Sequence, residues 1–369
     1  PDVRGRQDDR QGITSSRTVL MSSNGARVLV TGAGGFIGSA LARTLCAQGY
    51  RVVAMLEPGA DSRGLADLDV ECLTGDVRDP QRVRVAVQGC YAVFHVAALY
   101  RFWTRRPQDF YDVNVGGTRN VLTAAEHAGV ERVVYTSTVG TLGLDPGPGE
   151  RPADEQDYPD VGHLFGAYKR SKYVAEHEVL RAGAQGQRIS LVLPTFPLGP
   201  GDRSPTPSGR LILDFLNGRI PGYVDTVLNV AHVDDVAQGH LLALERGAPG
   251  RSYILGGENV TLKQLLDELA AQTGLPSPRL HVPRSASLAA AWVSEVVEGR
   301  MLRRRPSIPL EGARMSTTRM AFDDSRARTE LGYAPRPFAE AVQASAQWFV
   351  DNGYVRDRRR AKIGWSPHP

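Results

Sequence analysis

The amino-acid sequence predicts an α/β protein with a doubly wound parallel sheet and a smaller, mostly helical C-terminal domain. From Ala26 onward, short runs rich in β-branched residues alternate with stretches of helical periodicity. A glycine-spaced turn, TGAGGFIG, follows the first of these runs. After Pro194 the sequence is rich in proline and glycine, and later segments resemble helices joined by proline-containing turns. Strands that alternate with helices form parallel sheets that are covered on both faces.

Most of the expected strands belong to the first half of the chain. Ile37, Leu41 and Leu45 recur at helical spacing after the glycine turn, and Gly49 ends that helix. The expected strands are 27–30, 51–56, 70–73, 92–97, 131–137 and 189–193, and the expected helices are 37–48, about 110–128, and one that contains Tyr168 and ends near residue 182. Right-handed crossovers would bring the carboxyl ends of these strands to one edge of the sheet, where ligands bind.

The second half of the chain predicts a loop, a return to the main sheet and a separate helical region. We expect residues 194–209 to form a loop over the cleft, not a strand, because of their proline and glycine content. Residues 229–245 resemble a strand of the main sheet followed by a helix, and 252–257 one more strand. The predicted organisation is a disordered leader 1–24 with Met21 as the natural start, a large domain of 25–196 plus about 226–258, a substrate-binding domain of about 197–225 plus 259–350, and a basic tail 351–369.

Composition excludes several classes of protein. No apolar stretch approaches the ~18 residues that a membrane span needs. The cysteines, Cys46, Cys72 and Cys90, lack metal-ligand spacing, and we expect buried thiols in a reducing cytoplasm. The net charge of +4 comes from residues 355–369. Such a tail could contact nucleic acid or an anionic membrane surface, but no nucleic-acid-binding fold accompanies it, and a frayed, solvated terminus is favoured.

The glycine turn predicts a dinucleotide site. Gly32, Gly35 and Gly38 are spaced three apart between a strand and a helix, with Phe36 and Ile37 in the same turn. Glycine is needed where the backbone turns sharply, approaches a pyrophosphate and packs closely on the strand. The pyrophosphate would then lie at the N-terminus of the helix, at the positive end of its dipole. This context predicts a Rossmann-type domain.

Glu57 closes the second strand, where a carboxylate can accept hydrogen bonds from the adenine ribose. A 2′-phosphate would meet repulsion there, so NAD(H) is favoured over NADP(H), although Arg63 lies nearby and could offset the effect. The alternative is an ordinary surface glutamate that starts a turn before Pro58.

A YxxxK pattern supplies the second chemical signal. Tyr168 and Lys172 stand at i and i+4, so they are neighbours on one helix face. A nearby ammonium and the positive nicotinamide ring would lower the pKa of the phenol from about 10 toward neutrality. Thr138 follows the fifth strand at the ligand edge, where its hydroxyl could hold a substrate oxygen. The three side chains predict proton transfer coupled to hydride transfer.

Together these motifs resemble the extended short-chain dehydrogenase/reductase family, and within it the branch of dihydroflavonol-reductase-like proteins and hopanoid-associated sugar epimerases. The resemblance covers about residues 26–349. It is carried by TGxxGxxG, GDVRD (75–79), HVAA (95–98), NVGGT (114–118), YTST (135–138) and YxxxK, together with ALYRFW (98–103), 209–226, 229–247 and 253–262. It implies a homodimer formed through the helices at about 110–128 and at Tyr168.

The resemblance also implies residue roles. Tyr168 would be the acid/base, Lys172 would lower its pKa and bind the nicotinamide ribose, and Thr138 would match the family's Ser/Thr. Cofactor contacts would come from Asp76 and Val77 at the adenine, Ala97 near the ribose, and Pro194 and Thr195 beside the carboxamide.

Two positions depart from the family pattern. Leu193 stands where sugar-nucleotide epimerases usually have Asn, which is closer to the reductases. Glu57 stands where reductases of this branch often have Arg, so their NADP preference does not carry over. We therefore predict an NAD(H)-dependent oxidoreductase acting on a ketone or secondary alcohol of a small molecule. The alternatives are a sugar epimerase with retained NAD and a redox sensor, which would typically lack the tyrosine.

The substrate side carries less information. Tyr100, Arg101, Phe102 and Trp103 follow the fourth strand, where they could line a pocket for a flat substrate or simply pack under the lid. His232 with Asp234 and Asp235 lacks a third metal ligand, and a helix cap by either aspartate is favoured over a metal site. No metal is expected.

Overall fold

The computed structural model describes residues 25–101, 103–143, 151–159, 164–301, 304, 306, 310–316 and 318–365. The predicted leader 1–24 and the candidate substrate residue Phe102 lie outside this range. Within it, none of the helices has the length and apolar character that crossing a membrane requires.

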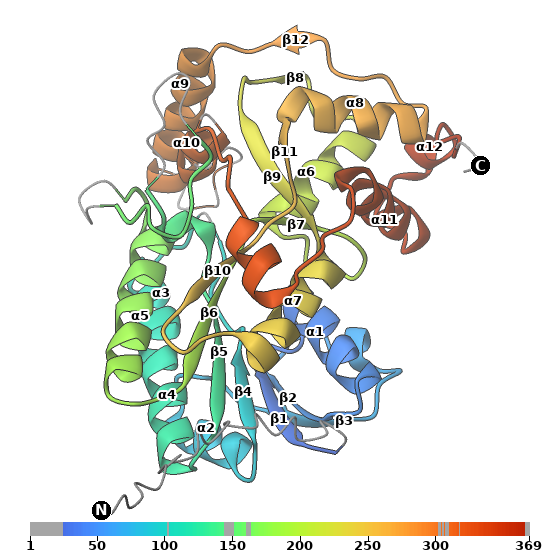
Figure 1. Cartoon of the computed structure of the whole chain (residues 1–369). Coiled ribbons are helices and arrows are strands. Elements are labelled where there is room, and N and C mark those ends of the chain that lie inside the picture. The colour runs from blue at the N-terminus through green and yellow to red at the C-terminus, as the bar shows by residue number, and fades with distance from the viewer. Residues whose placement is uncertain are drawn as a thin grey trace, which may run out of the picture.

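A seven-stranded parallel sheet forms the larger part of the molecule (Figure 1). Its spatial order is β3-β2-β1-β4-β5-β6-β10, so the order reverses between β1 and β4. The strands are β1 Arg27–Thr31, β2 Arg51–Leu56, β3 Val70–Thr74, β4 Ala92–His95, β5 Arg132–Thr136, β6 Ile189–Pro194 and β10 Ser252–Leu255. Ligands bind outside the carboxyl ends of such strands, at the point where the order reverses.

Helices cover both faces of this sheet, as the alternating pattern predicted. On one face α1 (Phe36–Ala47) packs against α7 (Val233–Arg246), and on the other lie α2 (Pro80–Val87), α4 (Gly117–His127) and α5 (Ala167–Ala184). A short helix α3 (Gln108–Tyr111) and a π-helical turn η2 (Asp112–Gly116) lead directly into α4. Short 3-10 turns occur at η1 (Arg63–Leu65) and η3 (Val139–Thr141).

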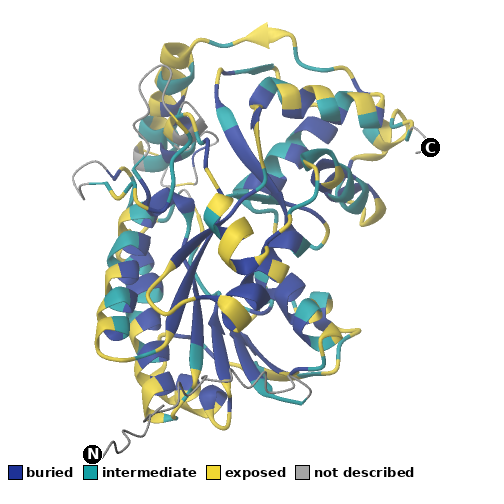
Figure 2. Cartoon of the chain, viewed as in Figure 1, coloured by how far each residue is buried: buried dark blue, intermediate teal, exposed yellow. Residues whose placement is uncertain are grey.

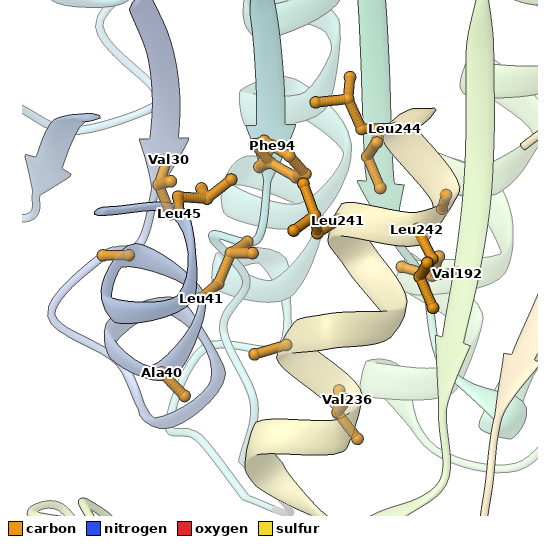
Figure 3. Packing of buried hydrophobic residues seen from close by; sticks show 14 of the residues in the cluster. Val30, Ala40, Leu41, Leu45, Phe94, Val192, Val236, Leu241, Leu242 and Leu244 are labelled. Atoms are coloured by element: carbon orange, nitrogen blue, oxygen red, sulfur yellow. The ribbon is translucent and has the colours of Figure 1, made fainter. Parts of the chain in front are cut away.

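Apart from the edge strand β3, the strands are buried on both sides and so separate two apolar cores (Figure 2). Val28 and Val30 point to the α1–α7 side, and Leu29 between them points to the other, because side chains alternate along a strand. Figure 3 shows Leu41 of α1 and Leu241 of α7 packed with Phe94 of β4. Each fully buried aliphatic side chain of this kind stabilises the fold by roughly 1.5–3 kcal/mol.

The smaller domain contains its own sheet, which corrects two predictions. Segment 194–209 includes a strand, β7 (Phe196–Leu198), and β9 (Val227–His232) pairs with β7 and with β11 (Glu258–Thr261), not with the main sheet. A continuous apolar run predicts a strand that is buried on both faces, but not which sheet it joins. The predicted large-domain segment 226–258 is therefore divided, because β9 packs in the core of the smaller domain.

Helices α6 (Pro207–Leu216), α8 (Leu262–Thr273) and α11 (Phe338–Asp351) surround a third apolar core in the smaller domain. After α8 come α9 (Arg284–Ser294), the π-helical η5 (Glu295–Met301) and α10 (Leu310–Ser316). The π-helical η6 (Ala327–Leu331) packs instead against α7 and β10 in the large domain. A two-stranded sheet joins β8 (Gly222–Tyr223) and β12 (Leu280–His281).

The expected frayed tail is wrong for the part that the structure describes. After α11 the chain forms α12 (Asp357–Arg360), and Val355 is buried in the third core. Ile363 and Trp365 pack against the same core, and the Arg359 Nε donates to the Leu216 carbonyl at 3.0 Å. Apolar side chains between the basic residues anchor the segment, which the charge pattern alone did not reveal.

Candidate active site

The glycine turn between β1 and α1 requires the absence of side chains. Gly32 has φ +68°, and a Cβ there would lie 2.8 Å from the Ala97 Cα. A Cβ on Gly38 would lie 2.2 Å from the Gly32 carbonyl oxygen. The Gly35 N–H donates to the Gly32 carbonyl at 2.9 Å, and α1 begins at Phe36, followed by Ile37. This close backbone turn at the N-terminus of α1 fits the pyrophosphate of a dinucleotide.

The adenine side of the predicted cofactor site lies beside β2 and β3. Glu57 is exposed directly after β2, at the edge where ligands bind. The Arg63 guanidinium is held by the Asp61 carboxylate, with Nη2 to Oδ2 at 2.6 Å. Asp76 accepts hydrogen bonds from the backbone N–H and the guanidinium of Arg78. The arginine that could offset the charge of Glu57 is therefore already paired with a carboxylate.

The predicted nicotinamide end lies at the carboxyl ends of β4 and β6. The Ala97 N–H donates to the Thr31 hydroxyl at 3.2 Å, which fixes the chain beside Gly32. Pro194 ends β6, and Thr195 follows it. The Thr195 Oγ1 is buried and has no hydrogen-bond partner among the described residues. A buried hydroxyl without a partner is costly, so this atom fits a site completed by a polar group such as a carboxamide.

Tyr168 and Thr138 come together as the sequence predicted. Thr138 stands between β5 and η3, where its Oγ1 accepts from the Gly140 N–H at 3.1 Å. Tyr168 is 6% exposed in the first turn of α5. Burial raises the pKa of Tyr168 above its usual range, Tyr100 raises it further, and a hydrogen bond with Thr138 opposes the rise. The phenol is therefore held in its protonated form at neutral pH.

Lys172 is buried beneath these residues, and its contacts differ from the expectation. Its Nζ donates to the Tyr135 hydroxyl at 2.8 Å and to the Thr136 carbonyl at 2.7 Å. Burial lowers the pKa of Lys172 to about 7. Lys172 is not among the groups that shift the pKa of Tyr168 in this structure. The lysine is directed to β5, and the role that the family resemblance gives it toward the phenol and the nicotinamide ribose stays a prediction.

A hydrogen-bonded network saturates the polar groups under the site. His95 bonds to Thr31 through Nδ1 at 2.8 Å and to Thr118 through Nε2 at 2.9 Å. Burial lowers the pKa of His95 to about 3, so it is neutral. The Asn114 Nδ2 donates to Ser171 on α5 at 2.9 Å. The network joins β1, β4, η2 and α5, and the sequence analysis gave these residues no individual role.

A second buried group, Glu176 on α5, accepts three hydrogen bonds. Its partners are the hydroxyls of Ser137, Thr141 at 3.0 Å and Tyr158 at 2.9 Å. These bonds tie α5 to the segment that carries Thr138. Glu176 therefore holds α5 against the segment after β5, which together supply the hydroxyls of Tyr168 and Thr138.

The predicted substrate residues differ in position. The Tyr100 ring centroid lies 5.0 Å from that of Tyr168, and Tyr100 is 38% exposed. Arg101 is exposed, and Trp103 lies against η5, with its Nε1 3.6 Å from where a Cβ on Gly299 would be. The structure brings Tyr100 to the phenol and directs Trp103 to the smaller domain.

Two further charged residues reach this site, and the sequence analysis missed both. Glu311 of α10 is 7% exposed, and it raises the pKa of both Tyr100 and Tyr168. Lys169 follows Tyr168 on α5, and burial lowers its pKa. Only the adjacency of Lys169 to Tyr168 was visible in the sequence.

The cap of α7 corrects another prediction. His232, not Asp234 or Asp235, precedes the helix, and its Nδ1 accepts from the Asp234 N–H at 3.1 Å. The Asp235 carboxylate instead accepts from the backbone N–H and Nε of Arg336. No group of three possible metal ligands occurs in the part of the chain that the structure describes.

Comparison with known proteins agrees with this architecture. The model of the NAD dependent epimerase/dehydratase family matches residues 28–256. A Synechocystis protein named "Putative dihydroflavonol 4-reductase" is 44% identical over 331 residues, which are 89% of this chain and 95% of that protein. Sterol demethylase protein B of Methylococcus capsulatus is 35% identical over 329 residues, 89% of this chain and 99% of that protein.

Solved structures show the same fold. The crystal structure of gox2253 superposes with a TM-score of 0.79 at 43% identity and covers 89% of this chain and 99% of its own. A DesIV double mutant, a dTDP-glucose 4,6-dehydratase from Streptomyces venezuelae with NAD bound, superposes with a TM-score of 0.71 at 24% identity. It covers 88% of this chain and 97% of its own, and this second likeness concerns the fold alone.

Proposed function

Because the chain belongs to the NAD-dependent epimerase/dehydratase family, the extended short-chain dehydrogenases/reductases, we propose that it is an NAD(H)-dependent oxidoreductase. It interconverts a ketone and a secondary alcohol on a small organic substrate. Several relatives carry reductase names, among them 2-alkyl-3-oxoalkanoate reductase of Stenotrophomonas maltophilia at 32% identity.

The observation that carries the proposal is the meeting of Thr138 and Tyr168 at the carboxyl edge of the sheet, beside the glycine turn. Thr138 follows β5, Tyr168 lies in the first turn of α5, and the Thr138 side chain opposes the rise in the pKa of the phenol. A substrate oxygen bound between them would receive a hydrogen bond from each hydroxyl. This is the arrangement that a carbonyl needs when negative charge develops on its oxygen.

The chain's own residues handle the proton. Burial keeps the Tyr168 phenol protonated, so in the reductive direction it donates its proton to the carbonyl oxygen while Thr138 holds that oxygen. Lys172 stays below the phenol and is positioned by Tyr135 and Thr136. A nicotinamide dinucleotide, when bound, supplies or accepts the hydride. Gly32, Gly35, Gly38, Ala97 and Thr195 would hold it, with Pro194, Asp76 and Val77 beside them.

The surroundings of Glu57 support a preference for NAD(H). A 2′-phosphate beside this carboxylate would meet like charge, and Arg63 is already paired with Asp61. We infer that NADH gives a higher kcat/KM than NADPH. Comparable values for the two would remove this role of Glu57.

The first prediction tests the function itself. The purified protein is assayed with NADH or NADPH against a panel of ketones, and its bound nucleotide is determined before any is added. Tyr168→Phe is expected to lower kcat by about 10²–10⁴ while NADH binding is retained, because only the proton donor is lost. Near-normal turnover by Tyr168→Phe would end this assignment. Stoichiometric NAD in the purified protein, with no need for added cofactor, would favour an epimerase.

We also propose a cytoplasmic homodimer, formed through α4 and α5. The ion pair between Arg119 of α4 and Glu178 of α5 orders the outer side of this helix pair. Two copies of the pair would form a four-helix bundle. A monomer by light scattering at micromolar concentration would contradict the dimer.

A further inference from the structure

Helix α10 of the smaller domain docks on the segment that leads into α5. The Arg314 guanidinium lies 3.6 Å from the centroid of the Phe165 ring. The next residue, Gly166, has φ +92°, and a Cβ there would lie 2.2 Å from the Glu311 Oε1. Gly166 is therefore a glycine for two reasons, its backbone conformation and the carboxyl group that packs on it. Glu311 therefore packs against Gly166, which precedes Tyr168 by two residues at the start of α5.

The Glu311 carboxyl is buried and incompletely satisfied. The residue is 7% exposed, and its Oε1 has no hydrogen-bond partner among the described residues. Burial raises its pKa to about 7, Lys169 opposes that rise, and Glu295 adds to it. An unpaired buried carboxyl oxygen destabilises the protein unless a ligand completes it. Its contact with Gly166, the residue that caps α5 two positions before Tyr168, places the carboxyl beside the candidate active site.

Lys169 lies near the Thr138 hydroxyl. Its Cε lies 3.6 Å from where a Cβ on Gly140 would be, and the Thr138 Oγ1 lies 3.4 Å from that same point. Glu311 and Lys169 attract each other electrostatically, but among the described side chains they form no direct ion pair. The two charges thus flank the catalytic hydroxyls without neutralising each other in contact.

We propose that Glu311 and Lys169 form a substrate subsite for a neutral hydroxyl group carried on a carbon close to the reacting carbonyl. The proposal rests on the proposed reductase function and narrows its substrate class to hydroxy ketones and the corresponding diols. A hydroxyl donates its proton to the Glu311 Oε1 and accepts from the Lys169 ammonium at the same time. Neither residue is needed for the hydride or proton transfer itself.

Other substituents satisfy this pair less well. A carboxylate at the same place meets repulsion from Glu311, an ammonium meets repulsion from Lys169, and a methyl group leaves both polar groups without a partner. Sites that hydrogen-bond a substrate hydroxyl discriminate strongly against analogues that lack it, because buried polar groups are then left unpaired.

The test compares matched probes. Two sets place the substituent one or two carbons from the carbonyl: 1-hydroxypropan-2-one, butan-2-one and pyruvate, and 4-hydroxybutan-2-one, pentan-2-one and acetoacetate. Discrimination is the ratio of kcat/KM values within a set, measured with NADH. In at least one of the two sets, the wild-type enzyme is expected to have a kcat/KM for the hydroxy ketone about tenfold or more above that for the alkyl ketone. The keto acid of that set is expected to have the lowest kcat/KM.

Two variants identify the group responsible. Glu311→Leu is expected to reduce the preference for hydroxyl over methyl to within about threefold of unity, because the acceptor is gone. Glu311→Gln keeps the shape, retains part of that preference, and improves the keto acid by about fivefold or more, because the negative charge is gone. Glu340→Gln, an exposed acid on α11, is the matched control and should change neither ratio. Unchanged ratios in Glu311→Gln would overturn the proposal, even if Glu311→Leu did not fold.

A binding measurement separates this proposal from the proposed function. Calorimetry on the protein loaded with NAD⁺, which cannot reduce a ketone, measures the dissociation constant of each probe without turnover. The ratios of these constants are compared within each set. If the wild-type protein reduces no ketone but still binds the hydroxy ketone more tightly in a Glu311-dependent way, the reductase function fails and the subsite stands. If it reduces alkyl and hydroxy ketones equally well, the reductase function stands and the subsite fails.

Discussion

The two sides of the active site differ in how completely their buried polar groups are satisfied. On the sheet side, Lys172 has two acceptors, His95 two hydroxyl partners and Glu176 three donors. On the facing side, the Glu311 Oε1 and the Thr195 Oγ1 have no partner among the described residues. Both sides are buried, so solvent does not explain the contrast.

This contrast separates scaffold from recognition. A saturated network holds its members in one geometry, because each lost bond leaves a buried group unpaired. Polar atoms left without a partner in a folded protein mark places where something else supplies one. Unpaired atoms also occur away from the site, at Gln187, Arg203, Gln272 and Ser345, so position beside Tyr168 or β6 is part of the argument.

The largest stability effect should come from the saturated side. Glu176→Ala is expected to lower the free energy of unfolding by about 3 kcal/mol, because three hydroxyls lose their acceptor in a buried place. Urea denaturation of the apo protein measures it. Glu178→Ala on the same helix removes only exposed ion pairs with Arg119 and Arg181 and should cost less than about 1 kcal/mol. Equal losses in the two variants would break the comparison.

The sequence predicted the saturated side far better than the facing one. The glycine turn, β1 to β6 and the meeting of Thr138 with Tyr168 follow from local periodicity and from the rule that parallel strands end at one edge. The direction of the Lys172 side chain did not follow, because i and i+4 spacing fixes a helix face but not the partner that a long side chain selects.

The facing side depends on contacts between residues far apart in the chain. Glu311 reaches Gly166 only after the smaller domain has folded, and α10 is too short for its sequence to reveal which surface it meets. The wrong prediction for β9 has the same origin. It was expected in the main sheet but pairs in the smaller one, and a strand that is buried on both faces suits either sheet. These features are set by tertiary packing, which local patterns do not encode.

A hydroxyl on the unsatisfied side should affect binding and not stability. Thr195→Val replaces an unpaired Oγ1 with a methyl group, so the apo protein should unfold at the same or slightly higher denaturant concentration. NADH binding should weaken about 5- to 10-fold, or about 1–1.4 kcal/mol, through loss of one hydrogen bond. Fluorescence titration measures this change.

Thr141→Val is the matched control for that prediction, because its hydroxyl is bonded to Glu176 on the saturated side. It should lower apo stability and leave the affinity for NADH nearly unchanged. If Thr195→Val lowers the stability of the apo protein and leaves NADH binding unaltered, the Thr195 hydroxyl supports the fold and not the cofactor, and the assignment is wrong.

The smallest effect concerns the pH dependence contributed by Lys172. Its pKa is about 7 in the folded protein, against an ordinary value of 10.5. Between these values the unfolded state binds more protons, so stability rises with pH, and below pH 7 the full penalty of burying the ammonium is present. From pH 7 to pH 8 this adds up to about 1 kcal/mol. Urea denaturation at the two pH values measures this effect. The quantity compared is the change in the free energy of unfolding with pH in the wild type and in Lys172→Met.

That difference tests how far the hydrogen bonds of Lys172 offset the cost of burying its ammonium group. Lys172 has two acceptors and the attraction of Glu176, yet desolvation outweighs them in setting its pKa. If the wild type and Lys172→Met show the same slope, the hydrogen bonds that the ammonium donates to Tyr135 and Thr136 fully stabilise it, and the amine stays charged throughout. A steeper slope in the wild type means that the free enzyme loses this charge near neutral pH. Binding of a cofactor or substrate that restores the positive charge must then be accompanied by protonation of the Lys172 amine. The saturated side fixes the position of this nitrogen but not its charge.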